Sequence, residues 1–261
     1  MSGLRHLLLV ARTVRIEAVR RREIYAIVLV AVGLIAVVLS LNFFDLDGLN
    51  KFYREISLRV MTWAAALTVL VLAARQLPRE FEQRTIYPLL ARPVGRAAFL
   101  AGKLAGVMAA GAFCFGLLMA VYIGGTLWMG GALPWGLFLQ YVYLQMVMFL
   151  ILACLGFLLS MLLSLDAAIT IGVVFFALAS TITHMISFLY PEADRGARAV
   201  YRALTVLLPQ LTLFDLSEKA VHAEAWSPLS FGVLAQLTAY GLLFSALYFA
   251  GAYLLFRRRP I

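Results

Sequence analysis

Six stretches of this chain are each apolar over about 20 residues, and this pattern limits its possible folds more than any other feature. A hydrocarbon core about 30 Å thick is crossed by about 20 residues of helix. The pattern therefore predicts an all-α polytopic membrane protein. We expect its six transmembrane helices at 24–44, 56–74, 104–128, 137–163, 167–190 and 231–256.

The composition supports one membrane domain over residues 1–261. Hydrophobic residues make up 64% of the chain and charged residues 13%, whereas soluble domains are about half apolar and about a quarter charged. The net charge of +9 does not predict a nucleic-acid partner, because the basic residues flank the apolar stretches. Cys114 and Cys154 fall inside predicted spans, where we expect them to pack as small hydrophobes.

A charged hairpin, 75–103, separates the second and third predicted spans. Charges in hydrocarbon cost several kcal/mol each, so we expect this hairpin to project into water. Pro78 suits the first position of a short helix, and Glu80 and Glu82 suit its positive N-terminal end. Pro88 and Pro93 would limit that helix to about two or three turns. The basic residues of the hairpin are Arg75, Arg79, Arg84, Arg92, Arg96 and Lys103.

The distribution of basic residues predicts the orientation in the membrane. With six spans, fifteen of the 22 lysines and arginines fall on the side that holds both chain ends and the hairpin. Cytoplasmic segments carry the excess of basic residues. We therefore expect both termini and the hairpin in the cytoplasm, and the connection 191–228 outside.

The external connection contains an apolar stretch, 203–216, that Pro209 interrupts. It is too short to span a bilayer. We expect it to form a re-entrant or surface helix pair that caps the outer mouth of the protein.

Residues 1–23 are expected to form an amphipathic helix on the membrane surface. Apolar side chains recur at helical spacing, and arginines lie mostly on the other side, where they would meet anionic lipid phosphates. The alternative is a solvated basic tail. The arginines concerned are Arg5, Arg12, Arg20 and Arg22.

Small residues recur every four positions in three predicted spans. This spacing lets helix backbones approach one another, so we expect helix contacts there, within or between subunits. The residues are Gly102, Gly106 and Ala110, then Gly156, Ser160 and Ser164, then Ala168 and Gly172.

Motifs for catalysis are missing from the sequence. No glycine-rich loop ending in Gly-Lys-Ser/Thr is present to bind nucleotide phosphates, and no catalytic or metal-binding spacing is found. His184, with Thr181 and Ser187 nearby, lies inside the fifth predicted span. It is either a helix-packing histidine or a functional one. Gln140 and Gln145 in the fourth span are expected to bond across helices rather than to line a path.

One block of the sequence resembles the region after the second span of ABC type-2 exporter permeases. It reads Glu82-x-x-Thr85, Leu89-Leu90, Arg92-Pro93-Val94-Gly95-Arg96 and Phe99-Leu100-x-Gly102-Lys103-x-x-Gly106. Arg84 replaces a usual glycine, and Pro88 falls in a normally leucine-rich stretch. In this family a short coupling helix, here around residues 80–85, contacts the ATPase. We therefore expect this helix to be bent or shortened.

The resemblance implies a subunit that moves cargo but does not itself hydrolyse ATP. In such transporters two permease subunits assemble with two cytoplasmic ATPase subunits, which bind ATP and Mg²⁺. The second permease would be another copy of this chain or a paralogue. This chain itself would bind no cofactor. Residues 80–85, with Arg92 and Arg96, would contact the ATPase, and the N-terminal helix would be a second contact. The location would be the bacterial inner membrane. By similarity, the first and fifth spans would line the path, with Thr181, His184 and Ser187 near the outer gate.

Two other functions fit the same residues. One is a membrane-embedded enzyme or assembly factor that acts on lipid or a cofactor through 191–228 and His184 or His222. The other is a non-transporting structural subunit. The sequence does not indicate the cargo.

Overall fold

Helices make up the framework of the described chain. The structure, a computed structural model, describes residues 22–40, 49–82, 95–189, 194, 196–198, 208–222, 224 and 226–258, and of residues 22–24, 49, 79–82 and 180–189 it describes the backbone alone. No strand occurs in these residues. The main elements are α2 (Arg22–Ser40), α3 (Leu49–Glu82), α5 (Arg96–Trp128), α6 (Trp135–Leu162), α7 (Leu165–Leu189), η2 (Leu211–Phe214), α9 (Ser217–Val221) and α10 (Phe231–Arg258).

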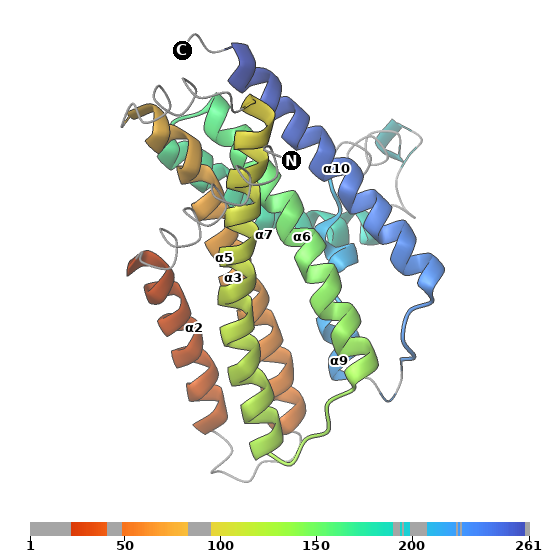
Figure 1. Cartoon of the computed structure of the whole chain (residues 1–261). Coiled ribbons are helices and arrows are strands. Elements are labelled where there is room, and N and C mark those ends of the chain that lie inside the picture. Colours follow the sequence, from red (N-terminus) through yellow and green to blue (C-terminus); the bar gives the residue numbers. More distant parts are fainter. Residues whose placement is uncertain are drawn as a thin grey trace.

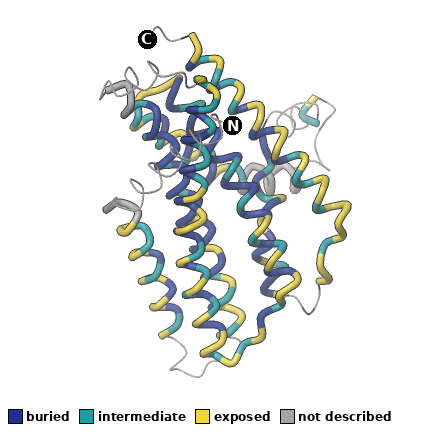
Figure 2. The backbone as a smooth tube through the Cα atoms, viewed as in Figure 1, coloured by how far each residue is buried: buried dark blue, intermediate teal, exposed yellow. Residues whose placement is uncertain are grey.

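Helix α3 is the central element of the bundle. Its 34 residues make a rod about 51 Å long, which exceeds the roughly 30 Å of a hydrocarbon core. Helices α5 and α6 lie along it, while α2 and α10 lie at opposite edges (Figure 1). Buried residues gather where α3, α5 and α6 meet, and α2 and α10 turn exposed faces outward (Figure 2). Large apolar side chains stand on those faces, including Leu29, Val37, Leu243 and Leu247.

Helix α3 meets three neighbours at glycines. A Cβ added to Gly156 of α6 would lie 2.8 Å from the Ala73 Cβ, and one added to Gly172 of α7 would lie 2.8 Å from Leu70 Cδ2. A Cβ at Gly111 of α5 would overlap Val69. The helices therefore approach more closely than any side chain would allow. The predicted helix contacts at Gly156 and Gly172 are confirmed, and both lie within this chain.

Polar side chains inside the bundle link α3 to α6. Thr62 Oγ1 and Tyr141 Oη are 2.7 Å apart, and Tyr141 Oη donates to the Leu58 carbonyl oxygen at 3.3 Å. These hydrogen bonds satisfy polar groups that would be costly to bury alone. Cys114 and Cys154 are free and buried, as expected of small hydrophobes.

The two glutamines of α6 differ in their surroundings. Gln140 holds the backbone of Leu229: its Nε2 donates to the Leu229 carbonyl oxygen at 2.9 Å, and its Oε1 accepts from the Leu229 N–H at 2.8 Å. The prediction that Gln140 bonds to another helix is wrong, because Leu229 lies in the segment that precedes α10. Gln145 is fully buried, and its side-chain amide has no hydrogen-bond partner among the described residues.

The described part of the connection before α10 folds into the bundle. Phe214 of η2 is fully buried and stacks with Tyr240 at a centroid distance of 6.2 Å. Its ring also lies against Gly241, the eleventh residue of α10 and thus about 15 Å from that helix's start. Element α9 then packs on α3 and α6.

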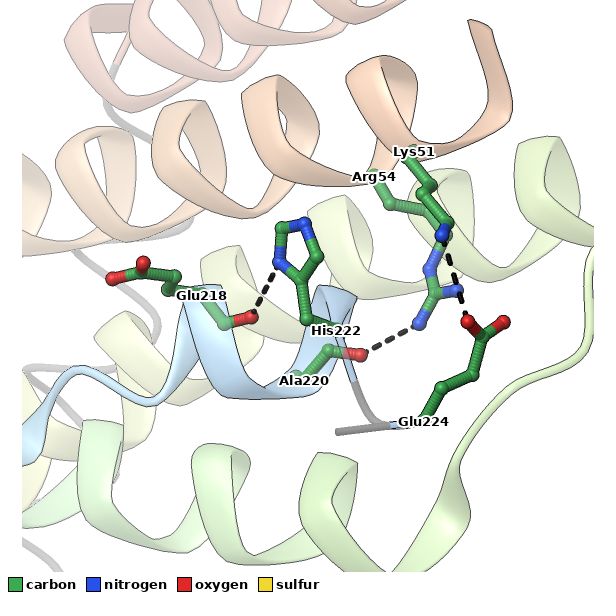
Figure 3. Close-up of polar contacts among 6 residues, drawn as sticks. All are labelled: Lys51, Arg54, Glu218, Ala220, His222 and Glu224. Atoms are coloured by element: carbon green, nitrogen blue, oxygen red, sulfur yellow. Dashed lines mark hydrogen bonds and ion pairs between the residues drawn. The ribbon is translucent and has the colours of Figure 1, made fainter. Parts of the chain in front are cut away.

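Charged residues hold α9 to the beginning of α3 (Figure 3). Arg54 Nη2 donates to the Ala220 carbonyl oxygen at 2.6 Å, where α9 ends. Lys51 Nζ lies 3.5 Å from Glu224 Oε2. His222 Nδ1 lies 3.2 Å from the Glu218 carbonyl oxygen. The contacts of Arg54 and Lys51 therefore join segments far apart in sequence at this end of the bundle.

Helices occupy all six stretches that the sequence predicted as spans, with different bounds. Four of them are long and apolar enough to cross a membrane: Asn50–Pro78, Arg96–Trp128, Trp135–Leu162 and Phe231–Arg258. Within the described residues, the apolar parts of α2 and α7 are shorter, at Tyr25–Ser40 and Leu165–Ala179.

The prediction that Pro78 begins a separate short helix is wrong. Helix α3 continues through Pro78 to Glu82. Proline has no N–H to donate to the Ala74 carbonyl oxygen, which disfavours it inside a helix. Here only one further turn follows it, and Leu77 beside it is fully buried. Packing therefore outweighs the lost hydrogen bond.

Substitution of Gly156 tests whether close helix approach stabilises the bundle. Gly156→Ala should lower the free energy of unfolding by about 1–3 kcal/mol, because the new methyl group overpacks against Ala73. The control is Gly116→Ala in α5, where an added Cβ meets nothing within 4 Å. That variant should be neutral or gain up to about 1 kcal/mol from helix propensity. Thermal unfolding in detergent measures both, and an equal response would contradict the packing argument.

Candidate coupling site at the shared end of three helices

The end of α3, the beginning of α5 and the end of α10 lie together at one end of the bundle (Figure 1, top). Arg96, the first residue of α5, donates from Nη1 to the Arg257 carbonyl oxygen at 2.7 Å. The last carbonyl groups of a helix lack partners within the helix, and a nearby cation is favourable there. Arg96 therefore caps α10, a helix 161 residues away in sequence.

Lys103 is the buried charge at this end. Lys103 is only 5% exposed. Its Nζ donates a hydrogen bond to Gln76 Oε1 at 3.2 Å, and the same atom lies 5.7 Å from the centroid of the Phe99 ring. The expectation that Lys103 projects into water with the hairpin is wrong. It stands two turns into α5, on the helix face that packs against α3, and the Gln76 amide replaces part of its hydration.

Two aromatic rings close the junction of α5 with α10. Phe99 and Phe256 stack with centroids 6.1 Å apart, and their exposed fractions are 2% and 0%. The polar contacts of Arg96 and Lys103 flank this apolar pair. We name the set of Gln76, Arg96, Phe99, Lys103, Phe256 and Arg257 the coupling end. It joins α3, α5 and α10 through side chains.

The residues that the sequence predicts for contact with an ATPase stand partly on described elements. Glu80 and Glu82 lie in the last turn of α3, and Arg96 begins α5. Arg84, Thr85 and Arg92 lie outside the described residues.

The remaining predicted residues are placed less fully. Arg22 begins α2, whereas Arg5, Arg12 and Arg20 lie outside the described residues. Thr181, His184 and Ser187 stand on the last three turns of α7, where the backbone alone is described. Contacts of these side chains stay predictions.

Sequence reasoning missed Gln76 and the capping of α10 by Arg96. Gln76 follows Arg75 in the short segment 74–77, and nothing in its neighbourhood indicates its partner. Lys103 is 27 residues away. Only the antiparallel packing of α3 and α5 brings the two side chains together.

The coupling end joins three helices through fixed side-chain contacts. It contains a lysine, an arginine and an amide held in fixed contacts, and no nucleophile beside a base. Among the described residues, no group of three or more His, Cys, Asp or Glu side chains lies close enough to hold a metal ion.

Gln76 gives a direct test of the buried lysine contact. Gln76→Leu should lower the free energy of unfolding by about 1–3 kcal/mol, because Lys103 loses a hydrogen-bond acceptor that water does not replace. Gln76→Glu should keep or raise stability, since it supplies an acceptor with opposite charge. Thermal unfolding of the purified protein in detergent measures both. Equal destabilisation by the two variants would show that packing volume, not the hydrogen bond, matters at this position.

Comparison with known proteins identifies the family of this chain. Residues 16–260 match a family described as ABC-2 family transporter protein. No curated protein matches the chain. The matched region covers nearly the whole chain and includes every helix described above. The chain therefore belongs to the ABC-2 family and is a membrane permease subunit of an ABC transporter.

Proposed function

We propose that this permease subunit serves an ATP-driven exporter in which separate ATPase subunits bind ATP and Mg²⁺ and hydrolyse the nucleotide. Membership of the ABC-2 family over residues 16–260 carries the proposal. The proposed assembly contains two permease subunits, a second copy of this chain or a paralogue, and two ATPase subunits. The chain itself contributes no catalytic residue and no cofactor site.

The proposed topology has six spans in the bacterial inner membrane. Both chain ends and the 75–103 hairpin lie in the cytoplasm, and the 191–228 connection lies outside. The asymmetry of lysine and arginine supports this orientation. The length of α3 is consistent with it, because a rod of about 51 Å extends beyond a core of about 30 Å and carries Glu80 and Glu82 out of the hydrocarbon.

In the proposed mechanism, the ATPase pushes on the segment 80–85 and on Arg92. The contacts of the coupling end pass that displacement to three helices at once. Gln76 and Lys103 tie α3 to α5, and Arg96 ties α5 to α10. A movement of the hairpin would therefore tilt α3, α5 and α10 together, as in rigid-body switching between packed states.

The path for cargo is proposed to run beside α2 and α7, with Thr181, His184 and Ser187 near its outer end. The apolar outer faces of α2 and α10 are available to lipid and to a second permease subunit. The N-terminal segment 1–23, with Arg5, Arg12, Arg20 and Arg22, would lie on the inner membrane surface beside the ATPase.

Cysteine labelling in cells tests the proposed topology. In a background with Cys114→Ala and Cys154→Ala, Thr85→Cys should react with a membrane-impermeant maleimide only after the cells are permeabilised. Glu224→Cys should react in intact cells, because residue 224 is exposed and lies at the opposite end of the bundle. Labelling of Thr85→Cys in intact cells would place the hairpin outside, and no cytoplasmic ATPase would reach it.

Co-purification tests the proposed partner. Tagged protein extracted from its native membranes in mild detergent should carry an associated ATPase activity. Glu82→Arg should reduce that activity strongly, because it reverses a charge in the proposed contact. The matched control is Glu224→Arg, the same change at the other end of the bundle, which should keep the activity. An eluate without ATPase activity from the unaltered chain would contradict the proposal.

A further inference from the structure

Three helices meet at a junction that contains buried polar atoms without partners. Ser57 of α3, Tyr122 of α5 and Gln145 of α6 are each 0% exposed. Ser57 Oγ, Tyr122 Oη and both polar atoms of the Gln145 amide have no hydrogen-bond partner among the described residues. Burying such groups unpaired costs free energy, and native structures normally pair them with protein or with ordered water. These atoms therefore call for a partner that the chain itself does not supply.

Stacked rings place Tyr122 between α3 and α6. Its ring centroid lies 6.4 Å from that of Tyr53 on α3 and 5.6 Å from that of Phe138 on α6. Phe138 in turn stacks with Tyr141 at 6.2 Å, and Tyr141 Oη lies 2.7 Å from Thr62 Oγ1. Tyr122 is also close enough to Tyr141 for the two side chains to interact electrostatically. The Tyr122 hydroxyl therefore belongs to the same junction as the Thr62–Tyr141 pair.

Ser57 joins this junction from α3. It precedes Leu58, whose carbonyl oxygen accepts from Tyr141 Oη at 3.3 Å. Ser57 Oγ is near the hydroxyl of Tyr53, one turn earlier, but forms no hydrogen bond with it. The Tyr53 hydroxyl donates to the Val121 carbonyl oxygen at 3.4 Å, which is long beside the usual O–H···O distance of about 2.7–2.8 Å. The hydroxyls of this group therefore keep unused hydrogen-bonding capacity.

Gln145 stands on the face of α6 that packs on α3. Tyr141, one turn before it, bonds to α3, and Gly156, about three turns after it, meets Ala73 of α3. Positions 141, 145 and 156 share one side of a helix with about 3.6 residues per turn. Because α3 and α6 run in the same direction here, the residue across from Gln145 is near Ala66. Ala66 is buried, and its methyl group offers no hydrogen bond and leaves room beside the amide.

The missing partner must donate and accept hydrogen bonds without carrying a charge. Gln145 Nε2 needs an acceptor and its Oε1 needs a donor, whereas the hydroxyls of Ser57 and Tyr122 can take either role. Lys103 is the one buried charged residue within the part of the chain that the structure describes, and it lies at the coupling end. No described carboxylate at the junction would offset a cation, and an unpaired buried charge is costly. Water is neutral and makes about two to four hydrogen bonds at buried polar sites.

We propose that the junction of α3, α5 and α6 holds internal water molecules that hydrogen-bond to Gln145, Tyr122 and Ser57 and connect them to the Thr62–Tyr141 pair. The waters form a polar layer inside an otherwise apolar bundle and hold α3 to both of its neighbours. This site is separate from the coupling end, which lies toward the other end of α3, and it does not rest on the proposed function.

Radiolytic labelling detects such waters directly. Full-length protein in nanodiscs is exposed to a short X-ray pulse, and the hydroxyl radicals that form from water oxidise the side chains beside them. Phe138 should be oxidised although it is only 2% exposed. The matched control is Phe157, which is 0% exposed on the same helix but outside the junction, and it should stay unmodified. Gln145→Met should reduce the oxidation of Tyr141, as measured by mass spectrometry of peptides.

Thermal unfolding in detergent distinguishes a hydrated amide from a dry one. Gln145→Met keeps the length of the side chain but removes its water-mediated hydrogen bonds, so it should lower the midpoint by about 3–8 °C. Leu144→Met introduces the same residue at a fully buried neighbour and should have a smaller effect, because it conserves volume and polarity. Tyr122→Phe removes one hydroxyl and should also lower the midpoint, which keeps the test valid if Gln145→Met does not fold.

Three results would overturn the proposal. A higher midpoint for Gln145→Met or Tyr122→Phe than for the unaltered chain would show that these polar atoms are dry, because removing an unpaired buried group is favourable. Oxidation of Phe138 no greater than that of Phe157 would show that the junction holds no water. A midpoint raised by Na⁺ or K⁺ in the unaltered chain, but not in Gln145→Met, would assign the site to a cation. ATPase co-purification does not depend on this junction, so its outcome separates this proposal from the proposed function.

Discussion

The close approach of α3 to its neighbours is the constraint on which the rest of the structure depends. Between helices in a membrane, hydrophobic burial gives little drive, so association relies on dispersion contacts and on interhelical hydrogen bonds. Glycines in α5, α6 and α7 let these helices meet α3 over its apolar length. The Thr62–Tyr141 hydrogen bond adds a directional contact at the same interface. A change in the position of α3 therefore alters three interfaces together.

The positions of the helices were predictable from the sequence because hydrophobic length is a local property. Each of the six predicted stretches contains a helix, and the helix contacts at Gly156 and Gly172 follow from small residues at four-residue spacing. The helix ends were less predictable. Helix α3 begins seven residues before the predicted span, because its first turns are polar and were not counted in the apolar stretch. At its other end it passes through Pro78, because Leu77 beside the proline is buried.

The coupling end shows why side-chain partners are harder to predict than helices. The sequence assigns Lys103 to a solvated hairpin and Arg96 to a contact with a partner. In the structure both bond within the chain, to Gln76 and to the Arg257 carbonyl oxygen. These pairs are separated by 27 and 161 residues, so only the packing of whole helices brings them together. The predicted residues 84, 85 and 92 lie outside the described residues, and their contacts stay predictions.

Proline within α3 has a mechanical consequence for the proposed mechanism, in which this helix would transmit force. Because Pro78 has no N–H, the i→i−4 backbone hydrogen bond to the Ala74 carbonyl oxygen is missing. The series of helical hydrogen bonds is therefore interrupted one turn before α3 ends. A helix bends most easily where a backbone hydrogen bond is missing. Load applied to Glu82 would then flex this joint before it reached the bundle. The Gln76–Lys103 hydrogen bond lies within this turn, because Gln76 stands between Ala74 and Pro78. In the proposed mechanism this bond would pass part of the load sideways into α5, so transmission would depend more on one amide than on the continuity of the helix.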